Sequence, residues 1–243
     1  MQFQTSSWES VKMQKEKCTA IVLAAGQGKR MGTTVQKQYL ELGEKPVLYY
    51  SLRAFEESPL IDEIILVVGD DQETYCREEI VDRYGFAKVI TIVQGGAERY
   101  HSVWNGLQKV DEGYVFIHDG ARPFVNEDII CRAYEDVKAC DACVVGMPVK
   151  DTIKVSDEDG FVKDTPDRTM LWMIQTPQVF RTSLVKEAYR KLMTQEEIRV
   201  TDDAMAVEQM LGHRVKLVMG SYENIKITTP EDLEIAATFL SKK

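Results

Sequence analysis

Long apolar runs are missing from this sequence of 243 residues. No stretch approaches the roughly 20 consecutive apolar residues with which a helix crosses a bilayer. Residues 1–17 are polar and mixed in charge, and they lack the apolar core of a secretion signal. We therefore expect no membrane partner, and we interpret 1–17 as an N-terminal extension that precedes one domain over 18–243.

Cysteine is scarce, and the cysteine positions do not match a disulfide-bonded or zinc-binding pattern. There are five cysteines, an odd number, and they are scattered at positions 18, 76, 131, 140 and 143. Cys140 and Cys143 make a single C-x-x-C pair, and no second pair completes a tetrahedral zinc site. This pattern argues against a disulfide scaffold and indicates reduced thiols in a cytoplasmic protein.

A basic surplus is also absent. The chain has 30 basic and 39 acidic residues, for a formal net charge of −9. Binding to the backbone of DNA or RNA requires a basic face, so we expect no nucleic-acid partner. Where cations do cluster on such an acidic protein, a small anion is the more plausible ligand.

What the chain does contain is an alternation of strand and helix patterns, with 44% apolar residues. Apolar runs predict strands at 18–24, 64–68, 88–93, 114–117, 142–149, 215–218 and 225–228. Helical spacing or capping residues predict helices that begin at Pro46, near residues 71 and 99, after Asn126 and after Thr229. We therefore predict an α/β fold with a single doubly wound, mostly parallel (Rossmann-like) sheet flanked by helices. Ligands of such folds bind outside the carboxyl ends of the strands.

The segment 20–39 is the most informative part of the sequence. Its apolar strand runs into a loop with glycines at 26, 28 and 32, and the cations Lys29, Arg30 and Lys37 lie in or just after this loop. Glycines let backbone N–H groups turn toward an anion, and cations suit a ligand with several negative charges. The spacing fits neither a Walker A loop nor a dinucleotide-binding loop. A nucleoside triphosphate is the ligand that these features favour.

This loop resembles the signature of the sugar-phosphate nucleotidyltransferases, roughly Ala-Ala-Gly-x-Gly-x-Arg-Met followed by Pro-Lys-Gln-Tyr or Phe. Within them the chain is most similar to the 2-C-methyl-D-erythritol 4-phosphate cytidylyltransferase family. Further matching segments follow in order over about residues 18–240, at 95–103, 117–123, 148–154, 175–178, 201–204 and 224–228. The resemblance implies transfer of CMP from CTP to methylerythritol phosphate with release of pyrophosphate and with Mg²⁺ as cofactor.

A phosphate nucleophile needs no general base at neutral pH, so such a site needs positioning and fixed positive charge. The resemblance implies that Arg30 and Lys37 contact the phosphates of CTP and that Lys226 contacts the α-phosphate. Lys226 stands in the expected strand 225–228, where a cation is costly unless it faces a partner. Asp119 is the expected Mg²⁺ ligand, and the alternative is a turn-forming Asp before Gly120.

Nucleotide recognition is implied for two glycine-containing segments. The residues concerned are Ala24, Ala25, Gly26, Gly28, Gly96 and Ser102, whose small side chains permit backbone contacts to cytosine. The family often carries aspartate where this chain has Ala97. Arg99 follows closely in the same segment. For this residue, a salt bridge at the start of a helix is an equal alternative to a role in nucleotide recognition. Asp202 and Asp203 are sufficiently explained as the capped start of a helix.

The resemblance assigns the acceptor phosphate to Arg122, Thr152, Arg168 and Thr176, for which an Arg fork and hydroxyl groups are suitable. Alternating residues around the polar turn at 156–160 predict a β-hairpin inside an arm at about 151–175. A lone hairpin is barely stable in water, so it must pack on something. In the family this arm embraces a second subunit, which implies a homodimer in which Thr152 and Arg168 serve the partner's site. A loop ion pair is the alternative for Arg168.

Some alternatives stay open at this level. Gln36 replaces the family's proline, which we expect to loosen the segment around Lys37. A ribitol-5-phosphate or other alditol-phosphate cytidylyltransferase shares the loop and fold, and a non-catalytic CTP-binding paralogue is a candidate of another class. A nucleotide-binding dehydrogenase requires a tighter glycine pattern than this loop has. The sequence does not identify a second metal ligand.

Overall fold

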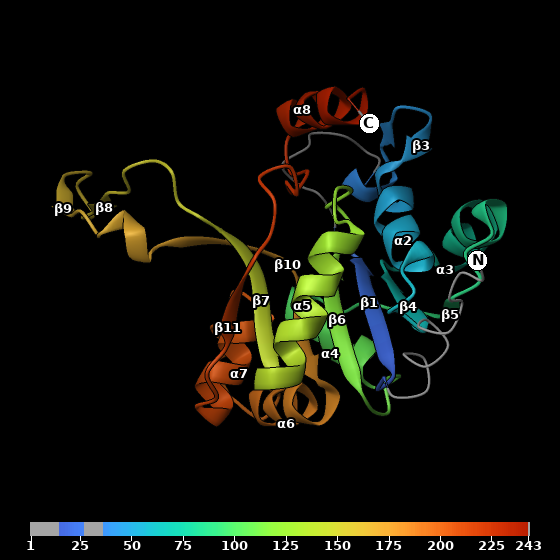
Figure 1. Cartoon of the computed structure of the whole chain (residues 1–243), viewed down its shortest axis with the longest axis horizontal. Helices are drawn as coiled ribbons and strands as arrows, with labels where there is room; N and C mark the ends of the chain where they lie inside the picture. Colours follow the sequence, from blue (N-terminus) through green and yellow to red (C-terminus); the bar gives the residue numbers. More distant parts are fainter. Residues whose placement is uncertain (1–14, 27–35, 243) are drawn as a thin grey trace, which may run out of the picture.

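The computed structural model describes residues 15–26 and 36–242, and its main sheet has seven strands in the order β11-β7-β10-β6-β1-β4-β5 (Figure 1). Neighbouring strands run parallel except where β10 pairs with β6 and β7. The strands are β1 (Cys18–Ala24), β4 (Glu63–Val68), β5 (Val89–Gln94), β6 (Tyr114–Asp119), β7 (Ala142–Pro148), β10 (Trp172–Arg181) and β11 (Lys216–Met219). The predicted single, mostly parallel sheet is confirmed.

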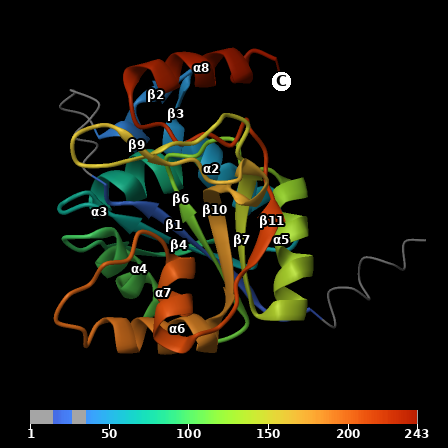
Figure 2. The ribbon, with the colours of Figure 1, turned by 90° about the vertical axis from the view of Figure 1, so that its left-hand side faces the viewer.

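Helices cover both faces of this sheet (Figure 2). One face is covered by α2 (Val47–Glu57), α5 (Glu127–Cys140) and the consecutive turns α3 (Glu73–Tyr75) and η3 (Cys76–Asp82). The other face is covered by α4 (Arg99–Leu107), α6 (Thr182–Leu192) and α7 (Asp203–Leu211). Along β1, Ala20 and Val22 pack into the first core and Ile21 into the second, as the alternation of a strand requires. Burial on both faces explains the uninterrupted apolar run of this strand.

The helices begin where the sequence predicts. The Asn126 side chain accepts a hydrogen bond from the Ile129 N–H at the start of α5. Thr229 and Asp232 form a capping box at the start of α8 (Pro230–Leu240). Helix α8 lies beyond the carboxyl edge of the sheet, next to the small hairpin β2 (Glu41–Leu42) and β3 (Lys45–Pro46) (Figure 1).

The strand predicted at 225–228 is wrong. Ile227 donates a backbone hydrogen bond to Ala121, but this segment joins no sheet ladder. Ile225 and Ile227 instead pack against α8, in a small core that also includes Phe124. The alternation that imitates a strand therefore has another cause. It arises because two isoleucines face α8 while Lys226 between them faces the sheet edge.

Strand β10 and helix α6 were not predicted. Pro177 argues against a central strand because proline cannot donate to the ladder. The structure accommodates it with an irregularity in the pairing of β10 with β7, between Ile174 and Gln178. The expected arm at about 151–175 therefore ends earlier than predicted, since its last residues already belong to this core strand.

The predicted hairpin is present and projects from the body of the molecule (Figure 1). It pairs β8 (Val155–Ser156) with β9 (Val162–Asp164) in antiparallel fashion, and the short helix η4 (Arg168–Met170) follows. The side chains of Phe161 and Met170 are 72% and 78% exposed. Within one chain the arm thus leaves large apolar side chains in water.

In the described residues, every helix is too short or too polar to span a bilayer.

Candidate active site

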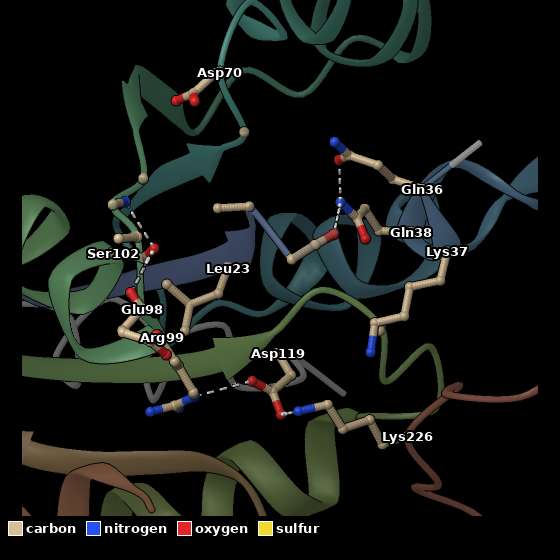
Figure 3. Close-up of a pocket in the computed structure, with 17 residues that line it drawn as sticks. Leu23, Gln36, Lys37, Gln38, Asp70, Glu98, Arg99, Ser102, Asp119 and Lys226 are labelled. Carbon is tan, nitrogen blue, oxygen red and sulfur yellow. Dashed lines mark hydrogen bonds and ion pairs between the residues drawn. The ribbon is translucent and has the colours of Figure 1, made fainter. Parts of the chain in front are cut away.

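A cavity of about 760 Å³ opens at the carboxyl edge of the sheet (Figure 3). Four adjacent parallel strands end at this cavity, and the register places Ala24, Val68, Gln94 and Asp119 at the same edge. The cavity is lined by the residues at or just after these ends: Ala25, Gly26, Gly69, Asp70, Gly95, Gly96 and Asp119. The predicted position of a ligand site, outside the carboxyl ends of the strands, is where this cavity lies.

The loop after β5 approaches the loop after β1 closely. A Cβ added at Gly95 would lie 2.5 Å from Ala25 Cβ, and one at Gly96 would lie 2.3 Å from His101 Cβ. The Ser102 hydroxyl accepts a hydrogen bond from the Gly96 N–H at 3.1 Å and donates one to Glu98 O at 3.3 Å. Ser102 therefore fixes the shape of this loop as well as lining the cavity.

Lys37 begins the short helix η2 (Lys37–Tyr39), and its side chain points to the same side of the cavity as Asp119 and Lys226 (Figure 3). Gln38 beside it is buried. Its amide donates to the carbonyl groups of Ala24 at 2.5 Å and Gly26 at 3.1 Å. This side chain thus ties the helix that carries Lys37 to Ala24 and Gly26 at the end of β1. Sequence reasoning assigned no role to Gln38.

Asp119 is the electrostatic centre of the cavity. Lys226 Nζ lies 2.8 Å from its Oδ2, Arg122 Nε lies 3.6 Å from the same oxygen, and Arg99 Nε lies 3.5 Å from Oδ1. Burial by itself would raise the pKa of this carboxyl. The surrounding charges of Arg99, Lys226 and Arg122 prevail and hold the pKa far below its usual range, so Asp119 is ionised.

Arg122 and Thr176 lie beside this carboxylate, behind the cavity wall. The Arg122 guanidinium is buried and donates to Asn224 O at 2.8 Å. The Thr176 hydroxyl accepts from the Asp119 backbone N–H at 3.0 Å and also bonds His118 Nδ1 at 3.0 Å. Two of the four residues predicted for the acceptor phosphate are therefore brought to Asp119.

His118 is fully buried, and burial lowers its pKa to about 4, so the ring is neutral at pH 7. Its Nε2 lies 3.2 Å from Arg122 O, a carbonyl oxygen that can only accept. The proton therefore belongs on Nε2, and Nδ1 accepts from the Thr176 hydroxyl. Both ring nitrogens thus have partners within the protein, so His118 is a satisfied core histidine.

The remaining predicted site residues either do not line this cavity or lie outside the part of the chain that the structure describes. Ala24 is buried at the end of β1 rather than lining the cavity. Thr152 and Arg168 lie on the projecting arm, where Arg168 donates to Lys150 O at 3.1 Å, and neither lines the cavity of its own chain. Gly28 and Arg30 lie outside the described residues.

Arg99 forms the salt bridge that was the equal alternative for it. Its Nη1 and Nη2 donate to the two carboxylate oxygens of Asp203 at 2.7 and 2.8 Å. Asp202 caps α7 as expected, through a bond from the Met205 N–H. The pairing of Asp203 with Arg99 was missed because the two residues are 104 positions apart and no local pattern connects them.

Within the described part of the chain, no group of three or more His, Cys, Asp or Glu side chains is arranged to hold a metal ion. Asp119 offers one carboxylate next to Lys226, in a cavity that the acidic residues Asp70 and Glu98 also line. Mg²⁺ commonly binds through one or two carboxylates together with phosphate oxygens of a substrate. The donor set therefore fits a metal ion that is shared with a nucleotide.

Comparisons with known proteins agree on one family. A family model described as 2-C-methyl-D-erythritol 4-phosphate cytidylyltransferase matches residues 18–242. Among similar proteins of that name, one from Lachnospira eligens is 56% identical, covering 91% of this chain and 98% of the relative. One from Lachnoclostridium phytofermentans is 53% identical, and the match covers 93% of this chain and 97% of the relative.

Solved structures show the same likeness. The crystal structure of 4-diphosphocytidyl-2C-methyl-D-erythritol synthase from Anaerococcus prevotii superposes with a TM-score of 0.81 at 35% identity, covering 93% of this chain and 99% of that one. The 2-C-methyl-D-erythritol 4-phosphate cytidylyltransferase from Francisella tularensis gives a TM-score of 0.76 at 32% identity. This match covers 90% of this chain and 98% of that one.

Proposed function

Because the chain belongs to the 2-C-methyl-D-erythritol 4-phosphate cytidylyltransferase family, we propose that it transfers the cytidylyl group of CTP to 2-C-methyl-D-erythritol 4-phosphate in the cavity at the carboxyl edge of its sheet. One observation carries the assignment of the site. Ala25 and Gly26 after β1 and Gly95 and Gly96 after β5 line one cavity with Asp119, Lys37 and Lys226. Backbone N–H groups, two cations and one carboxylate are the groups that a metal-bound triphosphate requires.

In the reaction, an oxygen of the acceptor phosphate forms a bond to the α-phosphorus of CTP. The bond from that phosphorus to the bridging oxygen of the β-phosphate breaks, and its electron pair leaves with pyrophosphate. The nucleophile is already an anion, so no residue has to remove a proton from it. The main barrier is repulsion between anions, which fixed positive charge lowers.

We assign the positive charge to Lys37 and Lys226, together with Arg30 from the glycine loop. Lys37 is directed into the cavity from η2, toward the side where Asp119 and Lys226 lie (Figure 3). Two cations at this place suit an in-line displacement, in which charge builds up on both the equatorial and the leaving oxygens. The base end of CTP is assigned to the turns around Ala25, Gly26 and Gly96, with Ser102 holding the last of these in shape.

Asp119 would hold Mg²⁺ together with phosphate oxygens of CTP, and the ion would supply further positive charge against the triphosphate. The ionised state of Asp119 supports this assignment, since a metal ligand must be deprotonated. The neighbouring cations would keep the carboxylate charged throughout the neutral pH range.

For the acceptor, Arg122 and Thr176 lie next to Asp119 in the same chain. Thr152 and Arg168 lie on the projecting arm, so their assignment requires the arm of a second copy. Exposed apolar side chains on the arm, among them Phe161 and Met170, support a homodimer in which a partner covers them. We propose that each site is completed by the partner's arm.

All five cysteines are free thiols, which supports a reducing compartment such as the cytoplasm.

The test is a substrate screen with purified protein. We expect pyrophosphate release from CTP with Mg²⁺ and 2-C-methyl-D-erythritol 4-phosphate, and much less when UTP replaces CTP. Release with ribitol 5-phosphate only would identify an alditol-phosphate cytidylyltransferase. Binding of CTP in a calorimeter without pyrophosphate release from either acceptor would identify a binding protein instead.

A further inference from the structure

Asp203 is a fully buried carboxylate to which the proposed reaction assigns no role. It lies in the first turn of α7, where the helix macrodipole favours an anion. The Tyr189 hydroxyl donates to its Oδ1 at 2.5 Å. Its backbone N–H donates to Gln178 Oε1 at 3.0 Å, and the next N–H, of Ala204, donates to the same oxygen at 2.9 Å. Elements β10, α6 and α7 thus hold this carboxylate in one place.

The partner of Asp203 is Arg99, in the first turn of α4, where the macrodipole disfavours a cation. Burial alone would lower the pKa of the Arg99 guanidinium, but the charge of Asp203 raises it well above its usual value. Arg99 is therefore charged and needs this counterion. The terminal nitrogens of Arg99 lie 2.7 and 2.8 Å from the oxygens of Asp203.

Arg99 is shared unequally between two carboxylates. Its Nε faces Asp119 Oδ1 at 3.5 Å, well beyond the two short bonds to Asp203 (Figure 3). The other oxygen of Asp119, Oδ2, is bound by Lys226 at 2.8 Å. Oδ1 is consequently the oxygen of Asp119 with the weaker contact to a neighbouring cation.

We propose that Asp203 is a positioning residue that holds the Arg99 guanidinium back from Asp119 Oδ1 and so keeps this oxygen available to a divalent cation. The inference rests on the proposed function, in which Asp119 is the metal ligand. The charge of Asp203 opposes that of Arg99, which is still one of the cations that lower the pKa of Asp119. Without the charge of Asp203, Arg99 would be drawn onto Asp119, because the interaction of opposite charges strengthens as they approach in a weakly screened site.

The experiment measures how strongly Mg²⁺ improves binding of CTP, without any turnover. Calorimetry gives the CTP dissociation constant in EDTA and in saturating Mg²⁺, and their ratio is the metal-dependent gain. In Asp203→Asn, which keeps the shape of the side chain but removes its charge, we expect this gain to fall by about tenfold. In Arg99→Gln with Asp203→Asn, we expect the gain to return to within about twofold of the wild type, because the freed cation is gone.

The double variant separates positioning from a structural role. If Asp203 only supported the fold, the Mg²⁺-dependent gain in CTP binding of the double variant would be no larger than that of Asp203→Asn. A gain that does not return in the double variant therefore overturns the proposal. An undiminished gain in a folded Asp203→Asn, checked by circular dichroism, also overturns it. If Asp203→Asn does not fold, the double variant decides alone. It buries no unpaired charge, and its gain must match that of the wild type.

The wild type serves as the reference for the proposed function. If Mg²⁺ gives the wild type no gain in CTP binding, then Asp119 is not its metal ligand and both proposals fail. If the wild type shows the gain and Asp203→Asn shows the same gain, only the role of Asp203 is refuted.

Discussion

The ammonium group of Lys226 lies 2.8 Å from Oδ2 of Asp119, so the cation proposed for the substrate phosphate is bound to the carboxylate proposed for the metal. A divalent cation at Asp119 and the Lys226 ammonium repel each other, since both carry positive charge. Binding of the metal with CTP would therefore weaken this ion pair and release Lys226 toward the phosphates. Lys226 is 35% exposed, so its side chain has room to move.

This relationship predicts two opposite effects of Lys226→Gln. Mn²⁺ binding to the nucleotide-free protein, followed by electron paramagnetic resonance, should become tighter because the competing ammonium is removed. Turnover should fall by about 10²–10³, the usual effect of removing one group that stabilises transition-state charge. The control is Lys216→Gln, which removes an exposed lysine of β11 that is paired with Asp136 of α5. Unchanged or weaker Mn²⁺ binding in Lys226→Gln would contradict the competition.

Lys37→Ala should lower turnover by about 10²–10³ while leaving the melting temperature nearly unchanged. The reason is that Lys37 lines the cavity, whereas the neighbouring Gln38 makes the contacts that hold η2 in place. Pyrophosphate release and a thermal melt measure the two quantities. A matched control is Lys191→Ala, which removes a half-exposed helix lysine paired with Glu187. Normal activity of Lys37→Ala would remove this lysine from the mechanism.

Gln36→Pro should be tolerated and should stabilise the protein by about 0.4–1 kcal/mol, because proline restricts the unfolded chain. Gln36 already has a φ of −64°, which is the value that the proline ring imposes. The lost side chain accepts one hydrogen bond from Gln38, which keeps its bonds to Ala24 and Gly26.

The control for this change is Gln36→Ala, which removes the same side chain without fixing φ. Urea unfolding compares the two variants, and the proline variant should be the more stable. A proline variant less stable than the alanine variant would show that the local backbone is not suited to proline.

Mixing two inactive variants tests whether the arm completes the partner's site. Lys37→Ala and Arg168→Ala should each be nearly inactive alone. After dissociation and random reassociation, half of the dimers are mixed, and each mixed dimer has one intact site. Activity should therefore recover to about a quarter of the wild-type value. No recovery, with dimers present in sedimentation, would place both residues in the site of the same chain.

The exposed apolar side chains of the arm predict how the proposed dimer is held together. Replacing Phe161 and Val162 by aspartate should shift the protein toward monomers in sedimentation experiments, since both side chains are more than half exposed in one chain. Lys163→Asp introduces an acidic residue into the same strand without removing apolar area and should remain dimeric. A dimer that survives deletion of 153–163 would show that the arm does not hold the subunits together.

Much of the fold could be predicted because its signals are local. The run at 18–24 is apolar except for Thr19, so burial on both faces follows. Asn126 and Thr229 cap helices through hydrogen bonds within one turn. Strand β10 was missed because Pro177 is locally unfavourable for a strand and is tolerated only through an irregular pairing with β7. The segment 225–228 was mistaken for a strand because its isoleucines pack against α8.

The sequence by itself determined the α/β class, the glycine-rich composition of the segment after the first strand, and the presence of Lys37 and Asp119 in segments that follow or end strands. These follow from the backbone freedom of glycine and from the period of apolar residues, which neighbouring positions fix. Only the tertiary structure decided that Lys226 pairs with Asp119 and that Asp203 binds Arg99 from 104 positions away. Such pairs depend on which strands and helices meet at one edge of the sheet, and burial among elements distant in the chain sets their electrostatics.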